Sequence, residues 1–70
     1  MTATPFALVS AEDSSKIFAY GLDISLDSGR DVITFRRDQG GQTMFGVHSS
    51  AESALLRFSH VTPLELVWEP

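Results

Sequence analysis

Hydrophobic and polar residues alternate without a break from residue 18 to residue 27. This period-two pattern is typical of a strand that buries one face and exposes the other. The apolar set comprises Phe18, Tyr20, Leu22, Ile24 and Leu26, and the alternate set comprises Ala19, Gly21, Asp23, Ser25 and Asp27. The alternation predicts that the first set meets a core and that the second set meets water.

Other apolar runs predict further strands, over residues 5–9, 32–37 and 43–47. Polar segments of hairpin-loop length separate the runs, which favours antiparallel pairing of successive strands. Gly29 suits the turn before the third strand because glycine accepts the left-handed conformation, and Gly40 and Gly41 interrupt the pattern before the fourth.

A helix is predicted over residues 50–59. Ser49 lies three residues before Glu52, which is the spacing of a capping box. Apolar residues then recur at helical intervals, at Ala51, Ala54, Leu55 and Phe58. Pro63 stops any continuation, and residues 64–69 alternate again as a last strand with Leu64, Leu66 and Trp68 inward.

The chain of 70 residues is therefore expected to form a single α+β domain in the order ββββαβ. We expect a mainly antiparallel sheet of about five strands with one amphipathic helix packed on one face. The helix should cover the apolar face of the sheet, so that Ala51, Leu55 and Phe58 meet Phe18, Tyr20, Leu22, Phe35 and Phe45. The opposite face, mostly small or polar on the longest strand, should lie in water.

Composition narrows the classes of function. Nine acidic residues against five basic ones give a formal net charge of −4, which disfavours nonspecific attachment to nucleic acid or anionic membranes. The charge favours a protein partner, in particular a basic one. The sequence has no cysteine, no leader pattern and no apolar run long enough to span a membrane, so a cytoplasmic location is expected.

Candidate chemistry is sparse. His48, Ser49 and Ser50 place an imidazole beside two hydroxyls, but a serine that caps the helix accounts for this group better than a nucleophile does. Asp23 is the one carboxylate in the middle of a strand, where we expect it to be solvated on the open face rather than to act as a base. His48 and His60 lack metal-ligand spacing. We therefore expect no catalytic activity, cofactor or metal.

The strand ends offer a partner surface. Trp68 should pack into the core if the last strand pairs as expected, and is otherwise an exposed anchor. If the first and last strands are neighbours, Val67 would join Ala7 and Val9 in a modest apolar patch. Val9, Val67 and Trp68 are thus the candidate partner-binding residues. Unpaired edge strands also favour a homodimer or addition of a partner's strand.

The leading hypothesis is a small protein–protein interaction or regulatory domain. The alternative is a nucleic-acid-binding domain that uses the hairpin at Arg36, Arg37, Gly40 and Gly41, where arginine side chains beside a flexible turn could grip phosphate. The non-functional interpretation of this hairpin is that its charged residues only make the exposed hairpin end soluble, with Arg36 and Arg37 on opposite faces. An enzyme is the third option, and it requires His48 and Ser49 to line a pocket with a carboxylate nearby.

Overall fold

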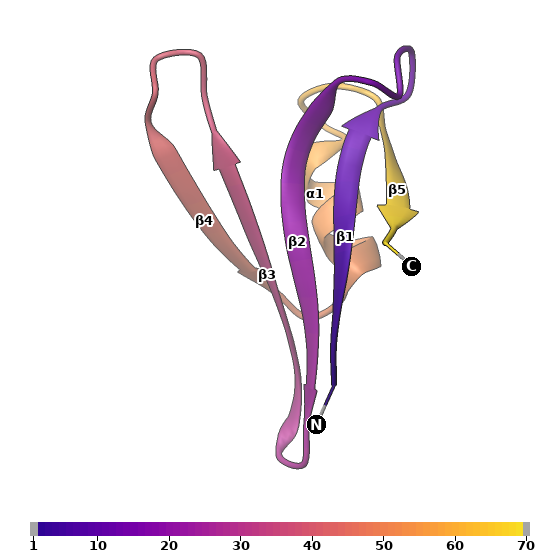
Figure 1. Cartoon of the computed structure of the whole chain (residues 1–70), viewed down its shortest axis with the longest axis vertical. Coiled ribbons are helices and arrows are strands. Elements are labelled where there is room, and N and C mark those ends of the chain that lie inside the picture. Colours follow the sequence, from indigo (N-terminus) through magenta and orange to yellow (C-terminus); the bar gives the residue numbers. More distant parts are fainter. Residues whose placement is uncertain (1, 70) are drawn as a thin grey trace.

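Polar turns fold the first four strands into a meander, and a helix then carries the chain back to the other side of the sheet (Figure 1). The computed structural model describes residues 2–69. Its elements are β1 (Thr2–Ser10), β2 (Ile17–Leu26), β3 (Gly29–Arg37), β4 (Thr43–His48), α1 (Ala51–Phe58) and β5 (Leu64–Trp68). All strand pairs are antiparallel, so the predicted α+β class and the order ββββαβ are confirmed.

The turns follow from local sequence. Leu26 pairs with Gly29, which leaves a two-residue connection between β2 and β3 and gives Gly29 a φ of +144°. In the longer β3–β4 loop, Gly41 has a φ of +83° and the Asp38 carboxylate accepts a hydrogen bond from the Gln42 amide at 2.9 Å. Both glycines occupy conformations that other residues rarely adopt.

The sheet order is β4-β3-β2-β1-β5. The last strand lies beside the first, with Ala7 opposite Val67, as the patch hypothesis required. The two edges are therefore β4 and β5. Within residues 2–69, α1 is a helix of only eight residues, and no helix is long and apolar enough to cross a bilayer.

The expected orientation of β2 is wrong. The register shifts between Leu8 and Val9, whose partners are Ala19 and Ile17, so Phe18 is the extra residue of a β-bulge. Phe18 packs toward α1, with its ring centroid 5.5 Å from that of Phe58. After the bulge, the residues of β2 that were expected to face the helix face the other way, because a shift of one residue exchanges the two faces of a strand.

The helix consequently covers the small side chains of β2. Ala19 is buried in the core, and Gly21 lies under the ring of Phe6. The apolar residues that were expected to meet the helix, Tyr20, Leu22, Phe35 and Phe45, lie on the opposite face. The prediction of a polar outer face is therefore also wrong, and we call this outer face the open face.

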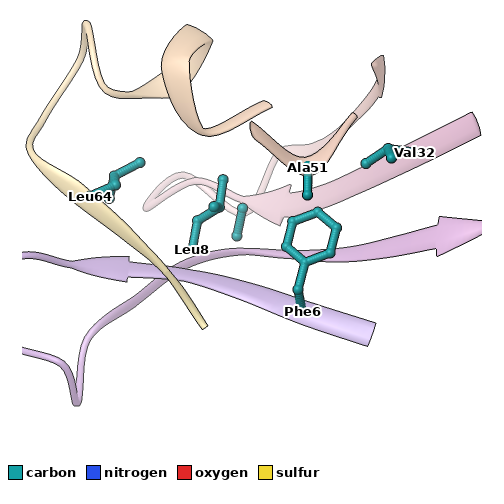
Figure 2. Close-up of a cluster of buried hydrophobic side chains, with 6 residues drawn as sticks. Phe6, Leu8, Val32, Ala51 and Leu64 are labelled. Carbon is teal, nitrogen blue, oxygen red and sulfur yellow. The ribbon is translucent and has the colours of Figure 1, made fainter. Parts of the chain in front are cut away.

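The core beneath α1 is thin. The largest fully buried side chains are Phe6, Leu8 and Val32, and small Ala51 and Ala54 are the buried residues of the helix. Figure 2 shows Ala51 above the Phe6 ring, with Leu8 and Leu64 beside them. Small residues on both helix and sheet allow close approach. The core therefore holds few large side chains, and Tyr20, Leu22, Phe35 and Phe45 lie on the other face of the sheet.

The cap of α1 differs from the predicted one by a residue. Ser50, not Ser49, is the N-cap, and its hydroxyl accepts a hydrogen bond from the Ser53 amide at 3.0 Å. The predicted capping box of Ser49 with Glu52 is not formed. The helix otherwise lies within the range expected from its periodicity.

Asp23 is buried rather than solvated. It shares the helix face with Val32, its partner on β3, and only 6% of its surface is exposed. Its carboxylate accepts a charge-assisted hydrogen bond from Arg30 Nε at 2.9 Å. Arg30 pairs with Ser25, two residues along β2, and so reaches Asp23 diagonally on the same face.

Candidate functional site

The most extensive candidate site is the open face of the sheet. Two rows of paired residues cross it from strand to strand. One row comprises Val67, Ala7, Tyr20, Phe35 and Phe45, and the other comprises Pro5, Leu22, Ile33 and Val47. Neither row contains a charged residue, so the centre of the face is continuously apolar.

Large side chains in these rows are accessible to solvent. The exposed fraction is 52% for Tyr20, 73% for Phe45 and 75% for Val47. The rings of Phe35 and Phe45 lie edge to face with centroids 5.2 Å apart. Between β2 and β3 the face is hollowed by a shallow depression lined by Tyr20, Gly21, Leu22, Ile33 and Phe35. Exposed apolar surface of this extent is characteristic of an interaction surface.

The three proposed partner-binding residues differ in exposure and do not all lie on one face of the sheet. Val67 belongs to the open face and is 43% exposed, whereas Val9 is only 5% exposed and presents little surface to a partner. Trp68 lies on the helix face, partly exposed, with its ring 5.4 Å from that of Phe6 and edge to face with it. The structure therefore brings Val67 into the apolar rows and separates Trp68 from them.

The hairpin residues of the nucleic-acid alternative are also divided. Arg36 pairs with Met44 and Arg37 with Thr43, so successive side chains of β3 project to opposite faces. Gly40 and Gly41 lie exposed in the loop. The two guanidinium groups therefore lie on opposite faces of the sheet. This agrees with the non-functional interpretation of the hairpin.

His48, Ser49 and Ser50 are engaged with other groups. His48 Nε2 lies 3.0 Å from the Thr34 hydroxyl, and both serine hydroxyls contact the Ser53 hydroxyl. Asp23 is separated from His48 by β3, because each of them pairs with Val32 from opposite sides. No hydrogen bond joins these groups into a nucleophile, base and orienting acid within the described chain.

A second hollow, of about 340 Å³, lies between α1 and the β3–β4 hairpin. Its polar lining comes from Thr34 and Arg36 on β3, His48 on β4 and Arg57 on α1, and Phe58 adds an aromatic ring. Burial, and secondarily the positive charge of Arg57, hold the pKa of His48 below its ordinary value of about 6.5. No aspartate or glutamate lines this hollow.

The sequence did not predict the apolar open face or the hollow lined by Arg36 and Arg57, because both depend on tertiary structure. The open face was concealed by the bulge at Phe18, which leaves no recognisable pattern of its own. Arg36 and Arg57 are distant in sequence, and only the packing of α1 near β3 and β4 brings them to one hollow. The small residues at Ala19, Gly21 and Ala51 were the available signal, since close packing requires small side chains.

No group of three or more histidine, aspartate or glutamate residues among residues 2–69 is placed to hold a metal ion. Comparison of the chain with protein-family models, with curated proteins and with solved structures found no match.

Proposed function

We propose that the chain is a protein–protein interaction module and that the open face of its sheet is the binding surface. The observation that supports this is the inverted packing of the sheet. Large apolar side chains, among them Tyr20, Phe45 and Val47, lie in the rows of the open face, while small residues such as Ala19 and Gly21 let the helix approach the other face. A partner that covers the open face would give the sheet a second apolar core.

The size of the face fits a protein interface. The two rows cross up to five strands at ordinary spacing, about 24 Å, and occupy about 14 Å along them, which gives about 330 Å² in projection. That is about 7% of the total accessible surface of 4862 Å². Side-chain relief adds to the projected area and brings it toward the roughly 800 Å² per partner of a standard interface.

The chemistry of the face favours a second copy of this chain as the occupant. Interfaces of transient partners are about as polar as ordinary surface, whereas permanent homodimer interfaces resemble a core cut in half. The two rows contain no charged residue and so belong to the second kind. Two copies that packed face to face about the two-fold axis would bury both rows between sheets about 10 Å apart.

Most charged side chains would lie outside such a dimer, and the few on the open face, such as Arg37, Asp31 and Glu65, would lie around its apolar rows. Each copy carries −4, so two copies carry −8, and the helices would face solvent. This supports the expectation of a basic partner for the assembled module, approached by electrostatic steering. The edge strands β4 and β5 remain alternative sites for such a partner, and a cytoplasmic location remains a prediction.

Sedimentation equilibrium at protein concentrations from about 1 to 100 μM tests the occupant. The wild type is expected to be a dimer in the upper part of this range, and the double variant F45S/V47T a monomer. Phe45 and Val47 lie on an edge strand and are about three-quarters exposed, so their replacement leaves the fold intact. L56S is the matched control, because Leu56 is 69% exposed on the helix, away from the open face.

A folded wild type that stayed monomeric over the whole range would reject the second copy as occupant. In that case the open face would have to bind a different protein. Equal dissociation by L56S and by F45S/V47T would move the interface away from the open face.

A further inference from the structure

The hollow between α1 and the β3–β4 hairpin lies on the helix side of the sheet, and Phe45 and Val47 of the open face also contribute to its lining along β4. Figure 1 shows the loop end of this hairpin diverging from α1, so that the helix does not cover it. The volume of about 340 Å³ lies at the small end of the range for ligand sites. Gly46 is part of its lining.

The lining is cationic in an acidic protein. Within residues 2–69 the one ion pair joins Arg30 to Asp23, so neither Arg36 nor Arg57 has a carboxylate partner in that range. Both nevertheless line the same hollow. Nine acidic residues are available in the chain, so the convergence of two arginines without an acid leaves a local excess of positive charge.

Arg36 is held in place but incompletely satisfied. Its guanidinium carbon lies 4.2 Å from the centre of the Phe18 ring, a cation–π contact that fixes the plane of the group. Its Nε is buried and has no hydrogen-bond partner among the described residues. A buried charged donor without an acceptor is costly, and an oxyanion accepts from a guanidinium through two parallel hydrogen bonds.

The remaining lining supplies a fixed polar pair and an aromatic contact. Thr34 and His48 are locked to each other by their 3.0 Å hydrogen bond. A Cβ on Gly46 would lie 2.7 Å from both the Thr34 hydroxyl and His48 Nε2, so the glycine lets this pair lie close over β4. The Phe58 ring lies edge to face with His48, with centroids 5.7 Å apart, and offers an aromatic wall.

We propose that this hollow binds a small organic oxyanion, a phosphate or carboxylate joined to an aromatic or aliphatic body. Arg36 and Arg57 bind the charged group from the sheet and from the helix. Phe58 and the neighbouring apolar side chains contact the body. The ligand neutralises the two unpaired cations.

Titration of the wild-type chain with phenyl phosphate, followed by the backbone amide NMR signals of Gly46 and His48, tests the site. We expect saturable binding with a Kd of about 1 mM or tighter. R57A and R36M should each weaken it at least about tenfold, as expected for loss of a hydrogen bond to a charged group. Methionine keeps the apolar stem of Arg36 against Phe18, and Arg57 is exposed, so R57A decides the matter if R36M fails to fold.

R37A is the matched control, since Arg37 follows Arg36 in β3 but lies on the other face. It should bind phenyl phosphate like the wild type, and phenol should bind at least about tenfold more weakly, because it lacks the charge. Absence of saturable binding up to about 20 mM would overturn the proposal. Equal weakening by R37A and R57A would overturn it as well, because it would indicate diffuse charge attraction.

Two further probes separate the sources of the oxyanion. Inorganic phosphate should bind more weakly than phenyl phosphate, and equal affinity would overturn the role of the apolar wall. A ten-nucleotide thymidine oligomer should not bind more tightly than phenyl phosphate at about 0.15 M salt. Tighter binding of the oligomer that depended on Arg36 and Arg57 would overturn the small-molecule assignment in favour of nucleic acid.

Discussion

The ring of Phe6 lies directly over Gly21 on the neighbouring strand. A Cβ placed on Gly21 would fall 2.1 Å from Phe6 Cζ, well inside any real contact. The two residues are cross-strand partners, and Phe6 is fully buried while Ala51 covers it from the helix. The glycine therefore makes room for the largest side chain of the core.

G21A should destabilise the fold by about 2 kcal/mol or more, measured by urea unfolding, because the added methyl group displaces the Phe6 ring. The sign is informative, since replacing a strand glycine by alanine without a clash commonly stabilises a protein by about 0.5 kcal/mol. F6L should relieve the clash, so the double variant F6L/G21A should lose less than the two single losses combined.

G40A is the control for this experiment. The nearest atom to a Cβ at Gly40 is Asp38 Oδ1 at 3.4 Å, which is ordinary contact. Its unfolding free energy should change by less than about 0.5 kcal/mol. A G21A variant as stable as G40A would show that Phe6 does not rest on the glycine.

Removal of either partner of the Arg30–Asp23 ion pair should have unequal effects. R30A leaves a buried carboxylate without its partner and should cost about 1–3 kcal/mol. D23A leaves Arg30, whose side chain is 59% exposed, free to be solvated, and should cost about 1 kcal/mol or less. The double variant should resemble D23A in urea unfolding, and equal losses in the two single variants would contradict the buried environment of Asp23.

Stability should decrease on mild acidification because of His48. Its folded-state pKa lies below the ordinary value of about 6.5, through burial and the charge of Arg57, so the unfolded chain binds more protons there. The unfolding free energy should therefore fall as the pH drops from about 7 through 6.5, and this contribution should level off below the folded pKa.

H48Q should abolish this part of the pH dependence, because glutamine keeps a hydrogen-bonding group near Thr34 and does not titrate. Thermal unfolding between pH 7.5 and 5 measures the difference from the wild type. Asp13 does not interfere, since its pKa is lowered from 3.8 by hydrogen bonds from Ser15 and its contribution is lost only in more acidic solution. An H48Q variant with an unchanged pH profile would refute the assignment.

Lysine substitutions at two valines should separate folding from association. V67K should keep the far-UV circular dichroism of the wild type and weaken the dimer, because Val67 is partly exposed on the open face. V9K should unfold the chain, because Val9 is 5% exposed and an unpaired charge is costly to bury. A folded V67K variant that dimerised like the wild type would remove Val67 from the interface.

The sequence by itself determined the local structure. Alternating residues defined the strands, Gly29 and the glycines of the β3–β4 loop marked turns, and the helical spacing from Ala51 to Phe58 located α1. These features depend on residues close together in the sequence. The conformational preferences and hydrophobic periodicity of such residues are strong enough to predict local structure. The sequence allowed β5 to lie beside β1, which is the arrangement in the structure, but it did not establish the sheet order.

Tertiary structure alone decided which face of the sheet the helix covers. The alternation of β2 is the same whichever face is buried, and one bulge at Phe18 exchanges the two. Close packing then favoured Gly21 and Ala19 under Phe6 and Ala51, buried Asp23 beside Arg30, and left Tyr20 and Phe45 outside. The hollow of Arg36 and Arg57 likewise exists only after α1 packs near β3 and β4, because its residues come from elements that are distant in the chain.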